Sequence, residues 1–418
     1  MFAREKLLFL LGIFISLGFT QGHWQLIGFA NQNVRCIAQH PADRSIMLIS
    51  IADTIYRTND TGHTWQPVAN FNGLPVNNIT YHPFHCDTVF ALVGAGSFSD
   101  ALYRSSDTGN TWEIVDRFVY PFSMTICSFP YIILLGTIGD GIYKSEDGAN
   151  TWEAMNTGLG DSSIYTLDYS YPFDTFPVFL AGTSRGLFYW SNNRWNQANG
   201  IAINARVTSI SYGAYSDTGF AAVGSGSFSD GIYRSTNFGW TWLMVDNWIY
   251  SSSVLSNPRN ESSVFAGDSG DGIKHSTDWG TNWSYMNQGL GNLFINCLSI
   301  HPVDTLLLFA GTQGGLYRYL FAPGIEEEKS NALNKKILFP TIISADEPII
   351  IRWDGAQAFL SNRVKLKIYD VSGRLIEYKD LANPSKQISI SPLKKSGVYF
   401  LVLSAGGVEY KDKLIIMK

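Results

Sequence analysis

The sequence predicts an all-β protein, and two observations carry that prediction. Short runs that alternate apolar and polar residues, such as Leu102-Tyr103-Arg104, are bounded by Gly, Asp, Asn and Ser, which is typical of strands joined by tight turns. One turn-like stretch, Ser-Ser-Asp-Thr-Gly-Asn-Thr-Trp at 105–112, recurs at a nearly fixed spacing along most of the chain. Hydrophobic residues make up 45% and aromatic residues 14% of the 418 residues, which is enough to fill a sizeable core.

The spacing of this stretch predicts the architecture of the larger part of the chain. The tryptophans that follow the turns are 47, 40, 43, 47 and 41 residues apart, and a period of 40–50 residues points to a propeller of four-stranded blades. The strand before each turn occurs seven times, the last as Leu316-Tyr317-Arg318, which predicts seven blades. No strand that begins with tryptophan follows the seventh copy. Residues 23–27, however, resemble residues 64–68, which contain the tryptophan that follows the first turn. We therefore expect the N-terminal strand to complete the last blade and close the ring, which removes an exposed edge.

The recurring turn has a physical explanation in its residue types. Asp and Ser side chains accept backbone N–H groups, Gly adopts positive φ, and Trp adds a large apolar plug at the start of the returning strand. This Ser-x-Asp-x-Gly-x-x-Trp pattern resembles the Asp-box of the bacterial-neuraminidase-repeat propellers, a family that includes sialidases, xyloglucanases, sortilin and photosystem II assembly factors. The resemblance implies that these turns are structural and lie away from any ligand. The residues assigned to them are Asp60, Trp65, Ser105, Asp107, Gly109, Trp112, Ser145, Asp147, Trp152, Ser235, Gly239, Trp242, Ser276, Asp278, Gly280 and Trp283.

The second blade serves as a template for chain direction. Its strands are expected at 78–82, 89–93, 101–105 and 112–115. Because the strands alternate in direction, the loops between second and third strands share one face with the connections between blades. The recurring turns lie on the opposite face.

The first of these faces holds the candidate binding residues. The stretch 93–100 returns 130 residues later at 223–230, and both copies end in Ser-Phe-Ser-Asp. Aromatic faces beside carboxylates suit sugar rings, whose C–H surfaces stack and whose hydroxyls donate to oxygen. The alternative is ordinary turn chemistry for the aspartates and core packing for the aromatic residues. The candidates are Phe98, Asp100, Tyr120, Asp140, Phe228, Asp230, Trp248, Tyr250 and Asp271.

These residues do not make up a complete catalytic motif. A glycosidase needs two carboxylates about 5–9.5 Å apart, and Asp100 and Asp230 are expected nearly opposite each other across the ring. The arginines at 185, 206 and 259 also lack the context of a sialidase site. We therefore predict a secreted or cell-surface module that binds a glycan or a protein. The alternatives are a glycoside hydrolase of sialidase or xyloglucanase type, and an assembly factor, which would need a basic face. No cofactor or metal site is predicted.

The N-terminus and the cysteines indicate the cellular compartment. Residues 1–22 read as a signal peptide, with Arg4 and Lys6 before an apolar run at 7–19 and small residues ahead of a cleavage site after Gly22. Four cysteines are too few for a disulfide scaffold in a chain of this length. Cys36 and Cys297 occupy matching positions in their repeats, which leaves a disulfide between them open, with free thiols as the other interpretation.

The composition changes after Ala322. Residues 23–322 carry 13 Lys and Arg against 23 Asp and Glu, which argues against nucleic acid as a partner, whereas 323–418 carry 15 against 11. Residues 323–336 read as a polar linker, and 337–418 as a small immunoglobulin-like β-sandwich.

The last part also carries recognisable motifs. The stretches 338–340, 364–374 and 396–402 and the terminal Lys-Leu-Ile-Ile-Met-Lys at 413–418 resemble the C-terminal sorting domain of the type IX secretion system. The resemblance implies that the secretion machinery is a partner of residues 337–418, that the protein reaches the extracellular space or outer cell surface, and that the domain is often removed after export.

Overall fold

A computed structural model describes residues 22–128, 131–171, 177–213, 217–224, 226, 229–247, 250–302, 305 and 307–321, together with most strands of the C-terminal part between 337 and 417. Residues 1–21 of the expected signal peptide lie outside these residues. The chain divides into two compact units, Met1–Ala322 and Pro323–Lys418. The described part contains no helix with the length and apolarity that crossing a membrane requires.

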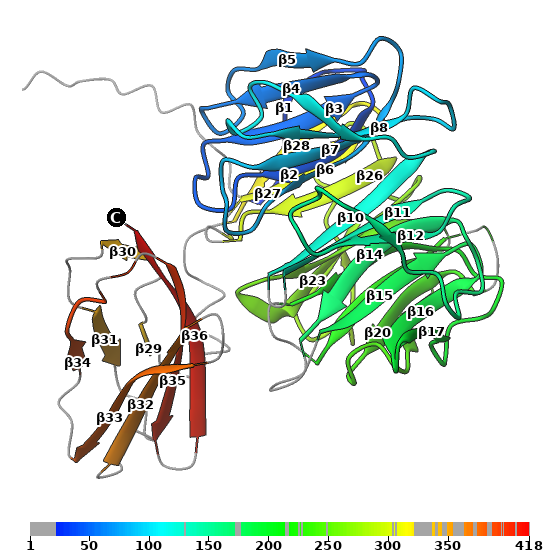
Figure 1. Ribbon diagram of the computed structural model, residues 1–418. Helices are drawn as coiled ribbons and strands as arrows, with labels where there is room; N and C mark the ends of the chain where they lie inside the picture. The colour runs from blue at the N-terminus through cyan, green and yellow to red at the C-terminus, as the bar shows by residue number, and fades with distance from the viewer. Residues whose placement is uncertain are drawn as a thin grey trace, which may run out of the picture. The chain divides into compact units, whose positions relative to one another are not determined.

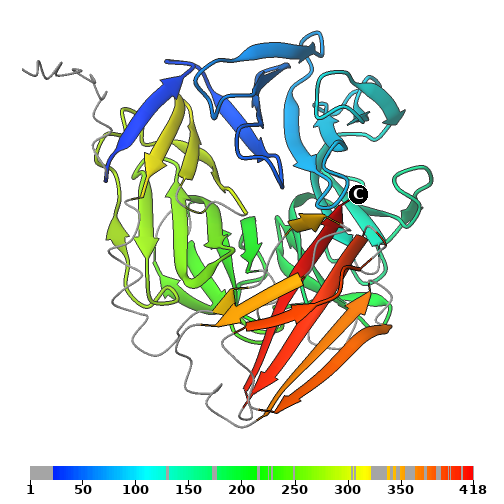
Figure 2. The ribbon, with the colours of Figure 1, turned by 90° about the vertical axis from the view of Figure 1, so that its left-hand side faces the viewer.

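The described strands of the first unit form seven four-stranded antiparallel sheets that follow one another around a ring (Figure 2). The first strand of each sheet contacts the first strands of its two neighbours, so these strands are innermost. In sheet order from the inside outward, the strands of sheets one to four are β2 (Val34–Gln39), β3 (Met47–Ile51), β4 (Thr54–Thr58), β5 (Gln66–Asn70); β6 (Val76–Tyr81), β7 (Val89–Val93), β8 (Ala101–Ser105), β9 (Glu113–Asp116); β10 (Pro121–Ser128), β11 (Tyr131–Thr137), β12 (Ile142–Ser145), β13 (Glu153–Ala154); β14 (Ile164–Ser170), β15 (Val178–Thr183), β16 (Gly186–Ser191), β17 (Arg194–Gln197). Those of sheets five to seven are β18 (Val207–Tyr212), β19 (Gly219–Val223), β20 (Gly231–Ser235), β21 (Leu243–Asp246); β22 (Ser251–Asn257), β23 (Asn260–Asp268), β24 (Ile273–Ser276), β25 (Ser284–Tyr285); β26 (Ile295–Ile300), β27 (Leu307–Thr312), β28 (Gly315–Leu320), β1 (Trp24–Gly28).

The N-terminal strand closes the ring at the place expected from the sequence. Strand β1 pairs antiparallel with β28, so the seventh sheet combines both ends of the first unit (Figures 1 and 2). Trp24 is 1% exposed, its backbone N–H donates to the carbonyl of Gln288 at 2.8 Å, and its indole N–H donates to that of Met286 at 2.6 Å. The closing strand is therefore held by packing as well as by its ladder of hydrogen bonds.

The core of this unit lies between adjacent sheets. The second strands are apolar and buried along most of their length, whereas the outer strands are largely exposed. One cluster of buried residues joins the seventh sheet to the first, with Phe309 and Leu316 packed against Val34, Met47 and Ile49. Each blade thus buries its apolar faces against its neighbours.

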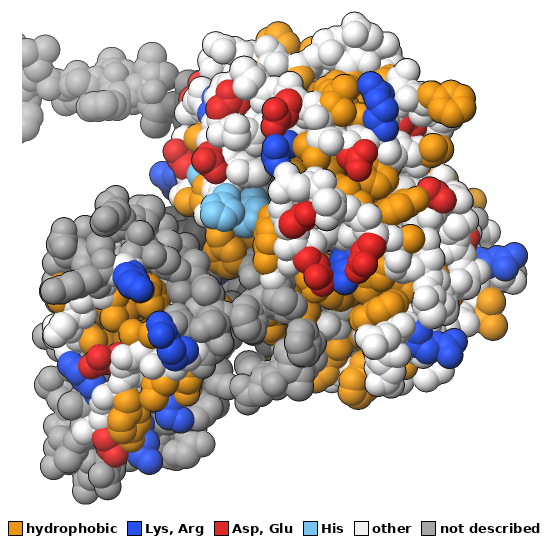
Figure 3. Space-filling model, in the orientation of Figure 1, with side chains coloured by type: hydrophobic (Ala, Val, Ile, Leu, Met, Phe, Trp, Pro, Cys, Tyr) orange, Lys and Arg blue, Asp and Glu red, His pale blue; other side chains and the backbone are white. Residues whose placement is uncertain are grey.

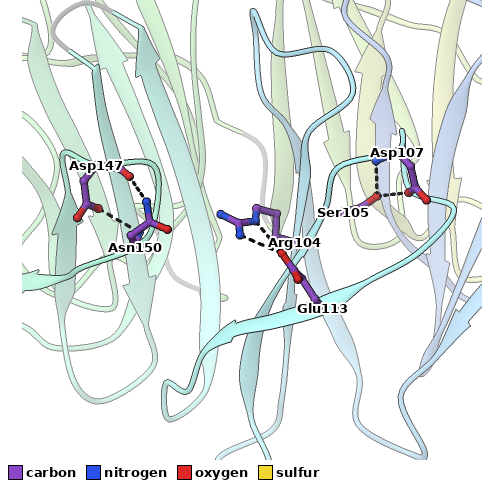
Figure 4. Close-up of polar contacts among 6 residues, drawn as sticks. All are labelled: Arg104, Ser105, Asp107, Glu113, Asp147 and Asn150. Atoms are coloured by element: carbon purple, nitrogen blue, oxygen red, sulfur yellow. Dashed lines mark hydrogen bonds and ion pairs between the residues drawn. The ribbon is translucent and has the colours of Figure 1, made fainter.

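The turns with the Ser-x-Asp-x-Gly-x-x-Trp pattern, termed box turns, are held together by their own side chains (Figure 4). The Ser105 hydroxyl accepts the N–H of Gly109 at 2.8 Å and donates to the Asp107 carboxylate at 2.7 Å. The same carboxylate accepts the N–H of Thr111 at 2.9 Å, and the Trp112 indole donates to the Gly109 carbonyl at 3.1 Å. These bonds satisfy the backbone of a tight turn, as the residue types predict.

The equivalent turn in the third sheet shows the electrostatic consequence. Hydrogen bonds from the hydroxyl and the N–H of Thr151 hold the pKa of Asp147 at about 2, well below its usual range. The carboxylate is therefore charged at any physiological pH and remains an acceptor for the turn.

In the second sheet the box glycine is constrained by packing as well as by conformation, whereas Ala149 occupies the same position of the third box turn with a φ of +71°. Gly109 has a φ of +89°, and a Cβ atom there would lie 2.7 Å from a methyl carbon of Leu48 on the preceding sheet. The turn thus closes directly onto the neighbouring blade, and only glycine combines that φ with that distance.

Two details of the strands differ from the expected template. Strand β6 begins at Val76 rather than at residue 78, and β9 begins at Glu113 rather than at Trp112. Trp112 belongs to the turn because its indole bonds back to Gly109. In the fourth sheet, Asn192 and Asn193 form a short turn with φ of 54° and 58° in place of a box turn.

The described strands of the second unit form two sheets, one of three strands in the order β29-β31-β34 and one of five in the order β30-β36-β35-β32-β33. Its strands are β29 (Ile337–Leu338), β30 (Ile342–Ser344), β31 (Ile349–Trp353), β32 (Arg363–Asp370), β33 (Leu375–Ala382), β34 (Gln387–Ile390), β35 (Gly397–Ala405) and β36 (Val408–Met417). Leu366, Ile368 and Leu401 are buried. Figure 3 shows acidic side chains dispersed over the first unit and several Lys and Arg side chains on the described part of the second.

All four cysteines are free thiols in this structure. Cys36 is buried, and its sulfur lies 2.8 Å from the Ser50 hydroxyl. Burial raises the pKa of Cys36 to about 11, so the thiol stays protonated.

Candidate functional site

The two faces of the ring are built from different connections, as the strand directions predict. On one face the loop between second and third strands meets the connection that enters the same blade, since the N–H of Gly94 donates to the Pro75 carbonyl at 2.9 Å. On the other face the box turn meets the loop between first and second strands, since the N–H of Thr108 donates to the Asp87 carbonyl at 2.8 Å. The first of these faces, where the inner strands begin, is termed the mouth of the ring.

Asp100 is turned inward at the mouth and holds its own loop together. The residue is 1% exposed, and its carboxylate accepts the N–H groups of Gly96 and Ser97 at 2.7 and 3.1 Å and the Ser97 hydroxyl at 2.6 Å. It also accepts the N–H of Tyr120 at 2.9 Å. Burial raises the pKa of Asp100, but these hydrogen bonds outweigh that effect and hold it below its usual value. The Asp100 carboxylate therefore anchors its own loop and the connection that carries Tyr120.

The equivalent Asp230 has the same setting. It is fully buried, and its carboxylate accepts the N–H of Gly226. In contrast, Asp140 and Asp271 are exposed at the ends of their loops. Their carbonyls accept the side-chain amides of Asn156 and Asn287, which tie each loop to its own blade. The four aspartates are thus two buried loop anchors and two surface residues.

The aromatic candidates lie on the surface as far as the structure describes them. Phe98 is 99% exposed at the tip of its loop, and Tyr250 is 55% exposed. Tyr120 and Tyr250 share a left-handed backbone, with φ of 49° and 63°, at equivalent positions after a fourth strand. Phe228 and Trp248 lie outside the described residues.

The inner strands carry a feature that the sequence did not reveal. All seven have a β-bulge directly after their first paired residue, at the mouth. The extra residues, termed the bulge ring, are Arg35, Asn77, Phe122, Tyr165, Thr208, Ser252 and Asn296.

Four members of the bulge ring link one blade to the next. Asn77 donates to the Pro121 carbonyl at 3.0 Å, and Thr208 donates to the Ser251 carbonyl at 2.9 Å. Ser252 and Asn296 donate in the same way to the carbonyls of Ile295 and Val34, at 2.7 and 2.8 Å. In each case the acceptor is the first residue of the next inner strand, so a short polar side chain at this position fastens the ring.

Large side chains replace this link on the third and fourth sheets. The rings of Tyr120 and Phe122 are 6.0 Å apart, and those of Phe122 and Tyr165 are 5.8 Å apart, both edge to face. The Arg206 guanidinium carbon lies 5.4 Å from the centre of the Tyr165 ring, an attractive cation–π arrangement. These four residues form a partly exposed row on one side of the mouth, termed the aromatic arc.

A second feature lies deeper in the wall formed by the inner strands. The hydroxyls of Thr166 and Ser211 accept N–H groups from the next inner strand, at 3.3 Å from Ile210 and 2.9 Å from Ser256. Asp168 takes the same role on β14 and accepts the N–H of Tyr212 at 3.0 Å. Burial raises the pKa of Asp168 to about 7, and the N–H groups of Tyr169 and Tyr212 offset only part of that rise.

Sequence reasoning identified Tyr120 of the aromatic arc but missed Phe122, Tyr165 and Asp168. Phe122 and Tyr165 look like core residues at the start of an apolar strand, and Asp168 looks like an exposed strand residue. A comparison of the second residue of every inner strand across the repeats would have revealed the bulge ring. Four of its members are short and polar, so the large side chains at the same position would have stood out. Arg206 lacks the sequence context of a sialidase site, and the structure places it beside Tyr165.

The described residues bring no group of three or more His, Cys, Asp and Glu side chains together in a way that could hold a metal ion. Two grooves of about 520 and 560 Å³ lie on the outer side of the ring, one along the fourth sheet beside Arg185 and Arg194, and one between the first and second sheets beside Tyr103 and Trp112. Neither includes the aromatic arc.

The two units are similar to different groups of known proteins. Residues 345–417 match the family described as secretion system C-terminal sorting domain. No curated protein sequence matches the chain closely enough to show a relationship.

Solved structures resemble the propeller. YCF48 from Cyanidioschyzon merolae is similar with a TM-score of 0.53 and 16% identity, over 71% of this chain and 99% of that one. An ancestral GH74 enzyme has a TM-score of 0.55 and 13% identity, over 94% of this chain and 63% of that one. The WD40 domain of Neurospora crassa Pan2 has a TM-score of 0.50 and 11% identity, over 73% of this chain and 97% of that one. At these identities the likeness shows the fold alone. The chain therefore combines an all-β propeller with a C-terminal sorting domain of the type IX secretion system, which indicates export to the extracellular space or outer cell surface.

Proposed function

We propose that the propeller is a binding module displayed at or released from the cell surface, and that it recognises a glycan at the mouth of its ring. The observation that carries the proposal is the aromatic arc, where Phe122 and Tyr165 occupy positions that fasten the blades elsewhere in the ring. A large apolar side chain that replaces an inter-blade hydrogen bond at the surface gives up a stabilising contact, which suggests selection for a different role.

The chemistry of the arc favours a sugar. Partly exposed aromatic rings offer faces and edges to the C–H surface of a pyranose, while the Arg206 guanidinium and the Tyr120 and Tyr165 hydroxyls can bond to its oxygen atoms. The exposed ring of Phe98 at the same face can contact a longer chain of sugars. Asp100 contributes by holding the loop that carries Phe98.

The burial and hydrogen bonding of the carboxylates favour binding of a glycan over its hydrolysis. Asp100 and Asp230 are buried in their own loops, which leaves them no direct route to a substrate. The Asp168 carboxylate accepts the N–H groups of Tyr169 and Tyr212 in the wall of inner strands, so it too is engaged by the fold.

The test is direct binding by the purified full chain. A glycan array followed by calorimetry on the best sugar class should give a binder, and Tyr165→Ala and Phe122→Ala should each weaken it by about tenfold or more, the scale of one lost stacking contact. Trp240→Ala is the matched control, because this tryptophan is 47% exposed on the box-turn face. Silence across the array, or equal losses for the arc variants and the control, would refute the proposal.

A further inference from the structure

Arg206 is the charged member of the aromatic arc, and its position is fixed from two directions. Its guanidinium lies against the Tyr165 ring, and its Nε donates to the Gly224 carbonyl at 3.3 Å. The residue is exposed, and within the described part of the chain its two terminal nitrogens meet no acceptor. A held guanidinium with free terminal nitrogens presents two parallel donors to the solvent at the mouth.

Arg206 carries its positive charge within an acidic unit. Residues 23–322 contain 13 Lys and Arg against 23 Asp and Glu, and some of these basic side chains form ion pairs. Arg104 pairs with Glu113 at 2.9 Å, and Lys274 pairs with Asp246 at 2.6 Å. No described carboxylate lies within ion-pair distance of Arg206, so its charge is available to a ligand.

We propose that the ligand of the mouth is an acidic glycan that contains uronic acid, with its sugar ring on the aromatic arc and its carboxylate on Arg206. Two N–H donors in a plane match the two oxygens of a carboxylate, and such a bidentate pair is stronger and more selective than a contact with a neutral hydroxyl. The carboxylate of a uronic acid is attached directly to the pyranose ring, so stacking and ion pairing engage one sugar unit. This inference rests on the proposed glycan-binding function and specifies its ligand class.

The experiment compares oligomers of galacturonic, glucuronic and mannuronic acid with the same oligomers after reduction of their carboxyl groups. Calorimetry with the full chain at low salt should show at least one acid oligomer binding about tenfold or more tighter than its neutral partner, the scale of one charge-assisted bidentate contact. Arg206→Gln should abolish this difference, and Arg206→Lys, which keeps the charge but not the fork, should reduce it. Arg35→Gln is the matched control, since Arg35 lies in the bulge ring on the first sheet and its loss changes the net charge equally.

Four results would overturn the inference. Equal binding of acid and neutral oligomers would remove the role of the carboxylate while leaving the glycan-binding proposal intact. An equal effect of Arg35→Gln would show nonspecific charge attraction, and preference for a sulfated neutral oligomer would point to a different anion. No binding of any oligomer or array glycan would refute the underlying function as well. Circular dichroism and thermal melting of each variant establish that the fold is retained.

Discussion

Closure of the ring by the N-terminal strand gives the sharpest test of the fold. Trp24→Ala removes the largest side chain of β1, which is 1% exposed and packs in a cluster with Phe265, Leu298 and Tyr317. Truncation of a buried tryptophan costs about 3–5 kcal/mol. The variant also leaves the Met286 carbonyl without its indole donor, a loss on the order of 1 kcal/mol that falls within the same range.

Equilibrium unfolding in urea, followed by tryptophan fluorescence, measures this loss in the right part of the protein. Eleven of the 12 tryptophans precede Pro323, so the signal reports the propeller rather than the sorting domain. Leu26→Ala on the same strand is the control, because Leu26 is 47% exposed and its truncation should cost less than about 1 kcal/mol. If Trp24→Ala cost no more than Leu26→Ala, the account of ring closure would be refuted.

Three further predictions concern single residues. The pKa of Asp168 is raised to about 7 from an unfolded value near 4, so the stability that its protonated form contributes is fully present below about pH 4, is lost progressively as the pH rises to about 7, and amounts to at most roughly 4 kcal/mol. Asp168→Asn should flatten stability between pH 4 and pH 8 in denaturant titrations, and an unchanged pH profile would contradict this. Gly109→Ala should destabilise by about 2–4 kcal/mol through positive φ and overlap with the neighbouring blade, whereas Gly73→Ala, at a φ of +86° with open space around it, should show only the cost of φ. If the two substitutions lowered the free energy of unfolding equally, overlap with the neighbouring blade would be excluded as a cause. Asp100→Asn should loosen its loop, because an amide replaces an acceptor of four hydrogen bonds, and amide hydrogen exchange at 95–99 should rise; unchanged exchange there would argue against the anchoring role.

The sequence by itself determined the all-β class, the repeat and the export signal at the C-terminus. These properties are local or periodic. Ser105, Asp107 and Gly109 make a turn with bonds that span four residues, so their identity predicts its geometry without knowledge of the rest of the chain. The pairing of β1 with β28 also followed from the repeat, because one strand was missing at one end and present at the other.

Only the tertiary structure decided which residues of the mouth face solvent and which hold the loops. Asp100 and Asp140 end similar loops, yet Asp100 is buried and Asp140 is exposed. The difference arises because the Asp100 carboxylate accepts the N–H groups of Gly96 and Tyr120. The aromatic arc depends on contacts between residues more than 40 positions apart, such as Phe122 with Tyr165 and Tyr165 with Arg206. Such contacts are set by how neighbouring blades pack at the centre of the ring, and no periodicity within a single blade encodes them.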